Sequence, residues 1–182
     1  MAGREMNSIV DALYELNYNP FKYSEHLASF YASVGEMENS LLLAPLVIPI
    51  CSHPFFSIKL QSANTNSSLW TIFDGETRVT SDRDKERYEK IISSVSKNKI
   101  VHREQLYDLQ ERINGFQNLT EDSIQYCLIN DWLSIDKDNL TFCFCSKSSP
   151  RFDGKNIAQK LGRLFSGYSV IEIYGFLGVK LR

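Results

Sequence analysis

Two stretches near the start of the chain carry apolar residues at the spacing of an amphipathic helix. The apolar face of residues 7–16 consists of Ile9, Leu13 and Leu16, which a period of 3.6 residues brings together. A second stretch starts near Pro20 or Ser24 and ends at Gly35, where positive φ costs nothing. We therefore expect a helical hairpin. The inward positions of its second helix are Leu27, Phe30, Tyr31 and Val34.

The longest apolar run covers residues 41–51. It has eleven residues and contains Pro45 and Pro49, whereas a helix that crosses a membrane needs roughly 20. We expect this run to lie in the core, and any helix in it to be kinked or broken at the prolines. A polar loop at 61–68 and a short apolar stretch at 69–73 follow.

Residues 76–99 are dense in charges of both signs and have little apolar content before Ile91. Such a stretch forms a solvated helix or a surface excursion. It divides the chain into an N-terminal helical lobe at 1–75, a charged linker or excursion at 76–100, and a second lobe at 101–182. We expect these parts to make one compact unit.

The second lobe has the order helix, turn, helix, hairpin. Helical spacing over 103–113 ends at Gly115, and Thr120 is expected to cap the next helix. Two short apolar stretches, 132–135 and 140–145, flank a polar turn and predict a β-hairpin. This order is the outline of a winged helix.

The C-terminal segment is strongly apolar. Residues 156–166 carry one apolar stripe, and residues 170–179 are apolar nearly all round. We expect an element that is apolar on nearly every side to be buried in the core or against a partner. The candidate partner-binding residues are Leu161, Leu164, Phe165, Ile173 and Phe176. The whole pattern predicts a mainly α protein with a small β-hairpin (α+β), built from an N-terminal helical lobe, a winged-helix-like lobe and C-terminal helices.

The charges argue against a DNA-reading winged helix. The net charge is only −2, so no overall positive field draws the chain to nucleic acid. The expected recognition helix, 121–131, carries Glu121, Asp122 and Asp131 and no Lys or Arg. Carboxylates oppose the counterion release that supplies most of the affinity for DNA. An acidic winged helix suits a basic protein surface better.

Residues 147–182 are the only clearly basic part of the chain, with seven Lys or Arg against two Asp or Glu. Such a segment is either a solvated face or a contact to DNA or to an acidic partner. The candidate residues for that contact are Lys147, Arg151, Lys155, Lys160 and Arg163.

No motif for catalysis or cofactor binding is complete. The glycines match neither the Walker spacing nor GxGxxG. Cys143 and Cys145 lack the further ligands of a zinc site, and residues 136–139 lack the glycine bend and bidentate acid of a calcium loop. The three histidines lie in separate segments. We therefore predict no catalytic residue, no cofactor and no metal, and hence a protein that is not an enzyme.

The beginning of the chain has no apolar stretch of the kind found in a secretory signal. In a reducing compartment the four cysteines would remain free thiols. We expect a cytoplasmic protein without a membrane partner.

Several sequence blocks together resemble one family. They are Asn19-Pro20-Phe21, the Leu41–Pro49 block before Ser52-His53, Ser68-Leu69-Trp70, Thr120 with Trp132-Leu133-Ser134-Ile135-Asp136, and Leu161-Gly162-Arg163-Leu164-Phe165 with Ile173-Tyr174-Gly175-Phe176-Leu177-Gly178-Val179. These blocks resemble the middle component of bacterial three-component ABC systems, which include the Lamassu anti-phage systems. The resemblance leaves out the first eighteen residues and the region 76–100. It departs from the pattern at Leu181, where relatives often carry proline.

The resemblance implies a subunit that joins an SMC-like, DNA-sensing ATPase to an effector, commonly a nuclease, and holds the effector in a restrained state. The leading hypothesis is a non-catalytic adaptor of an antiviral defence complex, with the ATPase and the effector as partners and DNA as a candidate contact within the complex. The alternative is a free-standing winged-helix DNA-binding regulator, which rests on the 103–145 outline and the basic C-terminal segment.

Overall fold

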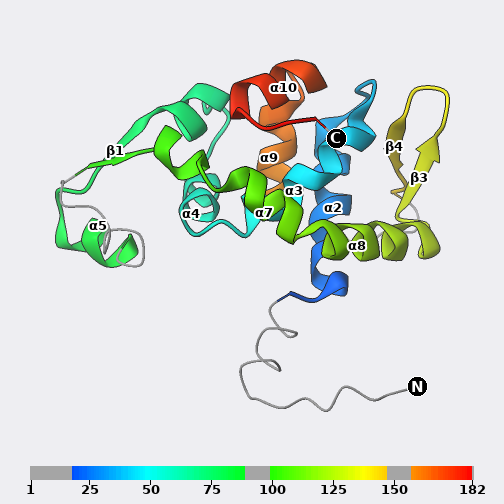
Figure 1. The fold of residues 1–182 in the computed structure, drawn as a ribbon, viewed down its shortest axis with the longest axis horizontal. Coiled ribbons are helices and arrows are strands. Elements are labelled where there is room, and N and C mark those ends of the chain that lie inside the picture. Colours follow the sequence, from blue (N-terminus) through cyan, green and yellow to red (C-terminus); the bar gives the residue numbers. More distant parts are fainter. Residues whose placement is uncertain (1–17, 89–98, 147–156, 182) are drawn as a thin grey trace, which may run out of the picture.

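The computed structural model describes residues 18–88, 99–146 and 157–181. These residues form a mainly helical protein with two small antiparallel sheets of two strands each, which confirms the expected fold class. The helix expected at 7–16 lies outside the described residues. Figure 1 shows helix α2 near the middle, with α10 on one side of the molecule, α8 on the other, and a hairpin at each end.

The central helix is α2 (Pro20–Val34). The Asn19 side chain accepts a hydrogen bond from the Phe21 amide at 2.8 Å, and Pro20 occupies the first turn, where its missing N–H is not needed. The helix ends at Gly35, whose φ is 74°. The predicted second helix is confirmed: it starts at Pro20, the earlier of the two expected positions, and it ends at Gly35 as expected.

The apolar block forms a 3₁₀ turn, η1 (Ser40–Leu43), and then helix α3 (Ala44–Cys51). Helix α4 (Pro54–Ser62) follows at an angle of 99° to the preceding helical segment. The break comes at Ser52 and His53, and Pro49 lies inside α3. Among the described residues, no single helix is long and apolar enough to cross a membrane, and only this bent pair passes that test jointly.

The charged region is an excursion that contains a short helix. A π-helical turn, η2 (Trp70–Asp74), leads into strand β1 (Glu76–Arg78), helix α5 (Asp82–Arg87) and strand β2 (Lys99–Val101). The two strands pair antiparallel, with Thr77 opposite Ile100. Figure 1 shows this unit extending from one end of the molecule. The pattern indicated the excursion but not the strands, which are only three residues long.

The second lobe contains η3 (Arg103–Leu106), α7 (Leu109–Gly115) and α8 (Gln117–Ile129). The helix expected over 103–113 is thus split in two. Thr120 does not cap α8, because its amide already donates to the Phe116 carbonyl at 2.9 Å within the helix. Strands β3 (Leu133–Asp136) and β4 (Thr141–Phe144) form the predicted hairpin, with Ser134 opposite Cys143.

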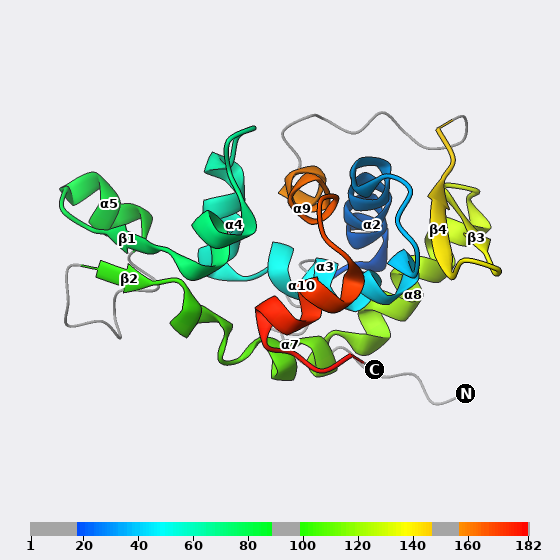
Figure 2. The ribbon, with the colours of Figure 1, turned by 90° about the horizontal axis from the view of Figure 1, so that it is seen from above.

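The chain ends with helices α9 (Ile157–Phe165) and α10 (Val170–Leu177). A reciprocal pair of hydrogen bonds between Ser169 and Glu172 caps α10. Gly178 ends it in the left-handed region, at φ 71°. Figure 2 shows α9, α2 and β4 side by side, with α3 and α10 across them.

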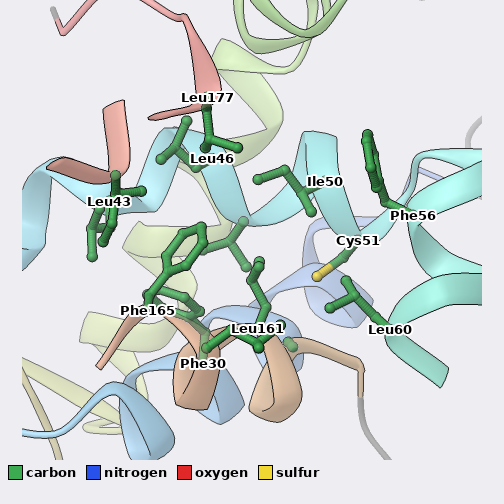
Figure 3. Packing of buried hydrophobic residues seen from close by; sticks show 14 of the residues in the cluster. Phe30, Leu43, Leu46, Ile50, Cys51, Phe56, Leu60, Leu161, Phe165 and Leu177 are labelled. Atoms are coloured by element: carbon green, nitrogen blue, oxygen red, sulfur yellow. The ribbon is translucent and has the colours of Figure 1, made fainter. Parts of the chain in front are cut away.

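One apolar core joins the described parts of 1–75 and 101–182. Helix α2 packs mainly against α8 and α9, and Figure 3 shows Phe30, Leu161 and Phe165 facing Leu46 and Ile50 of α3. The segment boundaries drawn from the sequence stay a prediction.

Candidate interaction surfaces

Most of the predicted partner-binding residues are core residues. Leu161, Phe165 and Ile173 have no exposed surface, and Leu164 is 8% exposed. A partner could not reach these side chains without opening the α9–α10 region. Phe176, the fifth candidate, is partly exposed and belongs to a surface described below. Partner contact by this end of the chain stays a prediction, for which Phe176 offers accessible surface.

The predicted basic residues divide into two groups. Lys147, Arg151 and Lys155 lie outside the described residues. Lys160 and Arg163 lie on α9, where the Lys160 ammonium donates to the Gln61 carbonyl at the end of α4. The structure therefore brings the cationic residues of α9 next to the C-terminal end of α4.

The first exposed aromatic surface, called here the Trp70 surface, consists of Trp70, Arg103 and Phe176. Leu69, Ile72 and Phe73 anchor the π-helical turn in the core. The turn leaves Trp70 58% exposed, and π-helical turns are often found at functional sites. The Trp70 ring meets the Phe176 ring edge to face, with centroids 4.7 Å apart.

Arg103 links the Trp70 surface to α10. Its guanidinium donates to the Phe176 carbonyl, and its Cζ lies 5.5 Å from the centroid of the Phe176 ring. A cation over an aromatic face is attracted by the ring quadrupole. Three segments distant in the sequence therefore present a tryptophan, an arginine and a phenylalanine in a fixed arrangement.

The second exposed aromatic surface, called the Phe21 surface, consists of Phe21, Tyr126, Ile129 and Trp132. Phe21 is 60% exposed and Ile129 is 80% exposed. The Phe21 and Tyr126 rings are 4.8 Å apart, and the Tyr126 and Trp132 rings are 5.4 Å apart. This surface joins the start of α2 to the end of α8, whereas the Trp70 surface includes α10, on the other side of α2 in Figure 1.

Sequence periodicity does not reveal either surface. It places Trp70 only in a short apolar stretch, and such a stretch does not say which residue points outward. Ile129 lies at an exposed position of α8, and its apolar side chain by itself does not show which face of the helix it occupies. The one signal is residue type, because Trp, Tyr and Arg dominate the energy of protein interfaces.

Two of the three histidines are buried and hold structure together. His53 Nδ1 accepts from the Phe55 and Phe56 amides and thereby caps α4. Its Nε2 lies 3.7 Å from an Asp108 carboxylate oxygen. Burial, helped by the nearby Arg112 guanidinium, lowers the pKa of His53 to about 4, against the opposing effect of Asp108.

His102 lies at the base of the β1–β2 excursion and is 1% exposed. Its Nε2 is 2.7 Å from the Thr77 hydroxyl oxygen. The Lys59 ammonium donates to the same oxygen at 3.3 Å. The His102 amide donates to the Gly75 carbonyl at 2.9 Å. Burial, and next the Lys59 charge, lower the pKa of His102 to about 4.

The part of the chain that the structure describes contains no group of three His, Cys, Asp or Glu side chains arranged to hold a metal ion. Cys51 and Cys127 are buried free thiols, and Cys143 and Cys145 are free thiols at the end of the β3–β4 hairpin. Burial raises the pKa of Cys127 to about 12, which disfavours the nucleophilic thiolate.

A comparison with known families gives one match. The model of the ABC-three component (ABC-3C) system Middle Component 3 family matches residues 7–181. The chain belongs to this family. No curated protein and no solved structure matches the chain. Membership makes it one component of a multi-component system, and implies interaction with the other components of that system.

The predicted order helix, helix, hairpin is present in this Middle Component 3 chain as α7, α8, β3 and β4, but the charge of this part does not fit a DNA groove. Helix α8 exposes Glu121 and Asp122 and contains no Lys or Arg. Lys137 in the turn between β3 and β4 lies between Asp136, the last residue of β3, and Asp138. The acidic side chains expected on α8 and at the hairpin turn therefore lie on this part of the folded chain.

The sequence blocks that resemble the family supply most of the two aromatic surfaces. Phe21 follows the Asn19 cap, Trp70 follows the Ser68-Leu69 turn, and Trp132 opens the hairpin. Phe176 comes from the last block. In the Middle Component 3 chain these blocks therefore contain both buried core residues and exposed aromatic residues.

Proposed function

We propose that this chain is a non-catalytic adaptor subunit of a bacterial anti-phage or anti-plasmid defence complex, located in the cytoplasm. It joins an SMC-like, DNA-sensing ATPase to an effector nuclease and restrains the effector until foreign DNA is sensed. The ATPase and the effector each contact a different surface of the adaptor.

The observation that carries this proposal is the family match over residues 7–181, since a middle component acts with other components of its system. The two aromatic surfaces support the same function. A protein that holds two partners at once needs two surfaces that do not overlap, and the Trp70 and Phe21 surfaces lie on different elements.

The chemistry of both surfaces suits protein binding. Trp, Tyr and Arg are the residue types most often found at the energetic centre of an interface. The ring contacts of Trp70 and Phe21 already restrict these side chains before binding. A restricted side chain loses less entropy when a partner covers it.

The first experiment purifies the chain by a tag after co-expression with the products of its neighbouring genes. We expect a large ATPase and an effector to copurify in a fixed ratio. Recovery of the chain alone, as a clean monomer, would rule out the adaptor function.

The second experiment tests the two surfaces separately with Trp70→Ala and Phe21→Ala. Both side chains are more than half exposed, so the fold should survive, which a thermal melt checks. Loss of a central interface aromatic weakens binding by about 30-fold or more. We expect each variant to lose one partner and keep the other, so each serves as the control for the other. Retention of both partners by both variants contradicts the surface assignment.

The restraining role has its own test. The cleavage of plasmid DNA by the purified effector is compared with that by the effector bound to this chain and the ATPase. We expect faster cleavage by the free effector. An effector that is equally active in both forms shows that the chain joins the partners without restraining them.

The alternative, a free-standing winged-helix regulator, is supported by the order α7, α8, β3, β4. It requires α8 to read DNA. Submicromolar, sequence-specific duplex binding that is lost on replacing Gln125 of α8 by Ala would favour it over the adaptor.

A further inference from the structure

A groove of about 190 Å³ lies between the loop that follows α4 and helix α9. Asn64, Thr65 and Ser67 line it from the loop, and Lys160 and Arg163 line it from α9. It therefore collects two cationic groups and three polar side chains. The described residues that line the groove include no Asp or Glu, so no carboxylate in its lining neutralises the two cations.

The sequence around this groove is free of acidic residues over a long distance. Residues 54–73 contain no Asp or Glu, and neither do residues 154–171, although the whole chain has 22. Helices α4 and α9, which belong to these two segments, pack against each other. The fold thus puts two acid-free segments side by side, and their positive charges are not neutralised from within either segment.

The loop wall has a shape fixed by its own hydrogen bonds. The Asn64 amide donates to the Ser67 hydroxyl oxygen at 3.0 Å, and the Asn66 amide donates to Asn64 Oδ1 at 2.9 Å. Ser67 accepts in this bond and keeps its own O–H proton as a donor. Thr65, at the tip of the loop, exposes a second hydroxyl.

The helix wall supplies the cations. Lys160 and Arg163 are three residues apart, so they lie on the same face of α9. The Lys160 ammonium donates to the Gln61 carbonyl, which fixes it at the groove edge with two protons left to donate. Arg163 is exposed, and its planar guanidinium matches two oxygens of one phosphate group.

We propose that this groove binds a phosphodiester group of a nucleic-acid backbone. Arg163 grips two phosphate oxygens, Lys160 adds a second positive charge, and the hydroxyls of Thr65 and Ser67 donate from the opposite wall. A phosphodiester offers oxygens on both sides of the groove, whereas a carboxylate presents its two oxygens on one side only. The contact does not depend on base sequence, and the proposal is independent of the adaptor function.

The test measures binding of the purified full chain to a labelled DNA duplex of about 20 base pairs, at several salt concentrations between about 50 and 200 mM. Lys160→Gln combined with Arg163→Gln should raise the Kd about tenfold, because two charge-assisted hydrogen bonds are lost. The slope of log Kd against log salt should fall by about one, the value for one phosphate. Arg163→Gln alone, which keeps the Lys160 bond to Gln61, should show an intermediate effect.

The control is Lys22→Gln combined with Lys137→Gln, which removes the same charge from two exposed lysines outside the groove. It should change the Kd by less than about twofold, the size of a screened long-range effect. Thr65→Glu, at an exposed loop position, should weaken binding as strongly as the double groove variant without touching the core. Equal losses in control and groove variants, or no duplex binding by the unaltered chain, would overturn the proposal.

Three competitors identify the ligand. A single-stranded oligonucleotide should displace the duplex, since both carry the same phosphodiester. Displacement by polyglutamate of equal charge would instead assign the groove to an acidic peptide, and displacement by inorganic phosphate at the same phosphate concentration would assign it to a free anion. Either result overturns the proposal of a nucleic-acid contact.

Discussion

At the scale of single residues, the two buried histidines make stability depend on pH. His53 Nδ1 must be unprotonated to cap α4, and His102 is packed beside Thr77 and Lys59. For both side chains the folded-state pKa is about 4, below the value near 6.5 of an unfolded chain. Protonation is therefore easier in the unfolded state.

The first prediction follows from the sign of this shift. Above about pH 6.5 both histidines are neutral in either state, and their contribution to stability is fully present. As the pH falls from about 6.5 to 4, the unfolded state takes up protons first and the free energy of unfolding decreases, by on the order of 3 kcal/mol per histidine. Urea unfolding across this range measures the slope. His53→Asn keeps a capping acceptor and should flatten the slope, whereas an unchanged slope would contradict the assignment.

Gly162 sets the distance between α2 and α9. A Cβ atom at this position would lie 2.5 Å from the Phe30 carbonyl oxygen and 3.1 Å from the Val34 amide nitrogen. Both atoms belong to the backbone of α2, so no side-chain rotation can relieve the contact. The glycine costs some helix propensity, but it allows the backbones of α2 and α9 to pack closely.

The second prediction is that Gly162→Ala destabilises the protein by about 1–3 kcal/mol, the usual cost of overpacking. Gly175→Ala is the matched control. Gly175 lies in α10, and a Cβ atom there would have no neighbouring atom within 4 Å, so alanine should be neutral or stabilising by up to about 1 kcal/mol. Thermal or urea unfolding of the two variants distinguishes them, and similar destabilisation by both would show that the close contact at Gly162 is not the cause.

At the scale of secondary structure, the same capping device occurs in two very different settings. Ser81 with Asp84 caps α5, and Ser169 with Glu172 caps α10. Helix α5 buries no side chain, whereas α10 buries Ile173 and three other residues. A cap affects global stability only as far as its helix is coupled to the core.

The third prediction is that Ser169→Ala lowers the free energy of unfolding by about 1 kcal/mol, the typical value for a lost N-cap. Ser81→Ala should change global stability by less than about 0.5 kcal/mol, as expected of a surface position away from the core. Hydrogen exchange in α5 should nevertheless increase. An equal loss of global stability in both variants would mean that the β1–β2 excursion is coupled to the core as tightly as α10.

The sequence predicts the elements whose signals are local. Pro20 and Gly35 mark the ends of α2, and the polar turn between β3 and β4 marks the hairpin. It does not predict β1 and β2, whose pairing joins residues more than twenty positions apart. Nor does it predict the start of α8, because the chain continues from α7 through Phe116 without needing a side-chain cap.

The candidate site is harder to derive than the fold, for a physical reason. Apolar periodicity finds the face that a helix buries, so it selected Leu161, Phe165 and Ile173, which belong to the core. Exposed aromatics such as Trp70 are placed by contacts with distant segments, here with Phe176, which Arg103 contacts in turn. Those contacts leave no periodic signal in the sequence.

At the scale of the whole molecule, the core joins parts that the charged region separates in the sequence. Helix α2 from the first half packs against α8 and α9 from the second half. Neither half therefore has a complete core by itself among the described residues. Domains with one shared core usually unfold in a single cooperative step.

The fourth prediction uses the two tryptophans, which report on different halves. Trp132→Phe leaves Trp70 as the single tryptophan, and Trp70→Phe leaves Trp132. Each variant should show one urea transition, and the fluorescence and circular dichroism midpoints of that variant should coincide. Separate midpoints for the two probes in the same variant would show that the halves unfold independently.

The tight crossing at Gly162 also bears on how distant relatives can be recognised. Phe30 contributes its backbone carbonyl oxygen to this contact. A different side chain at position 30 would therefore not remove the need for glycine at position 162. Any relative that keeps the same spacing between these two helices must keep a residue without a side chain at this point. A glycine at this point of α9 is therefore a requirement of the helix spacing itself, and it holds however far the rest of the sequence diverges.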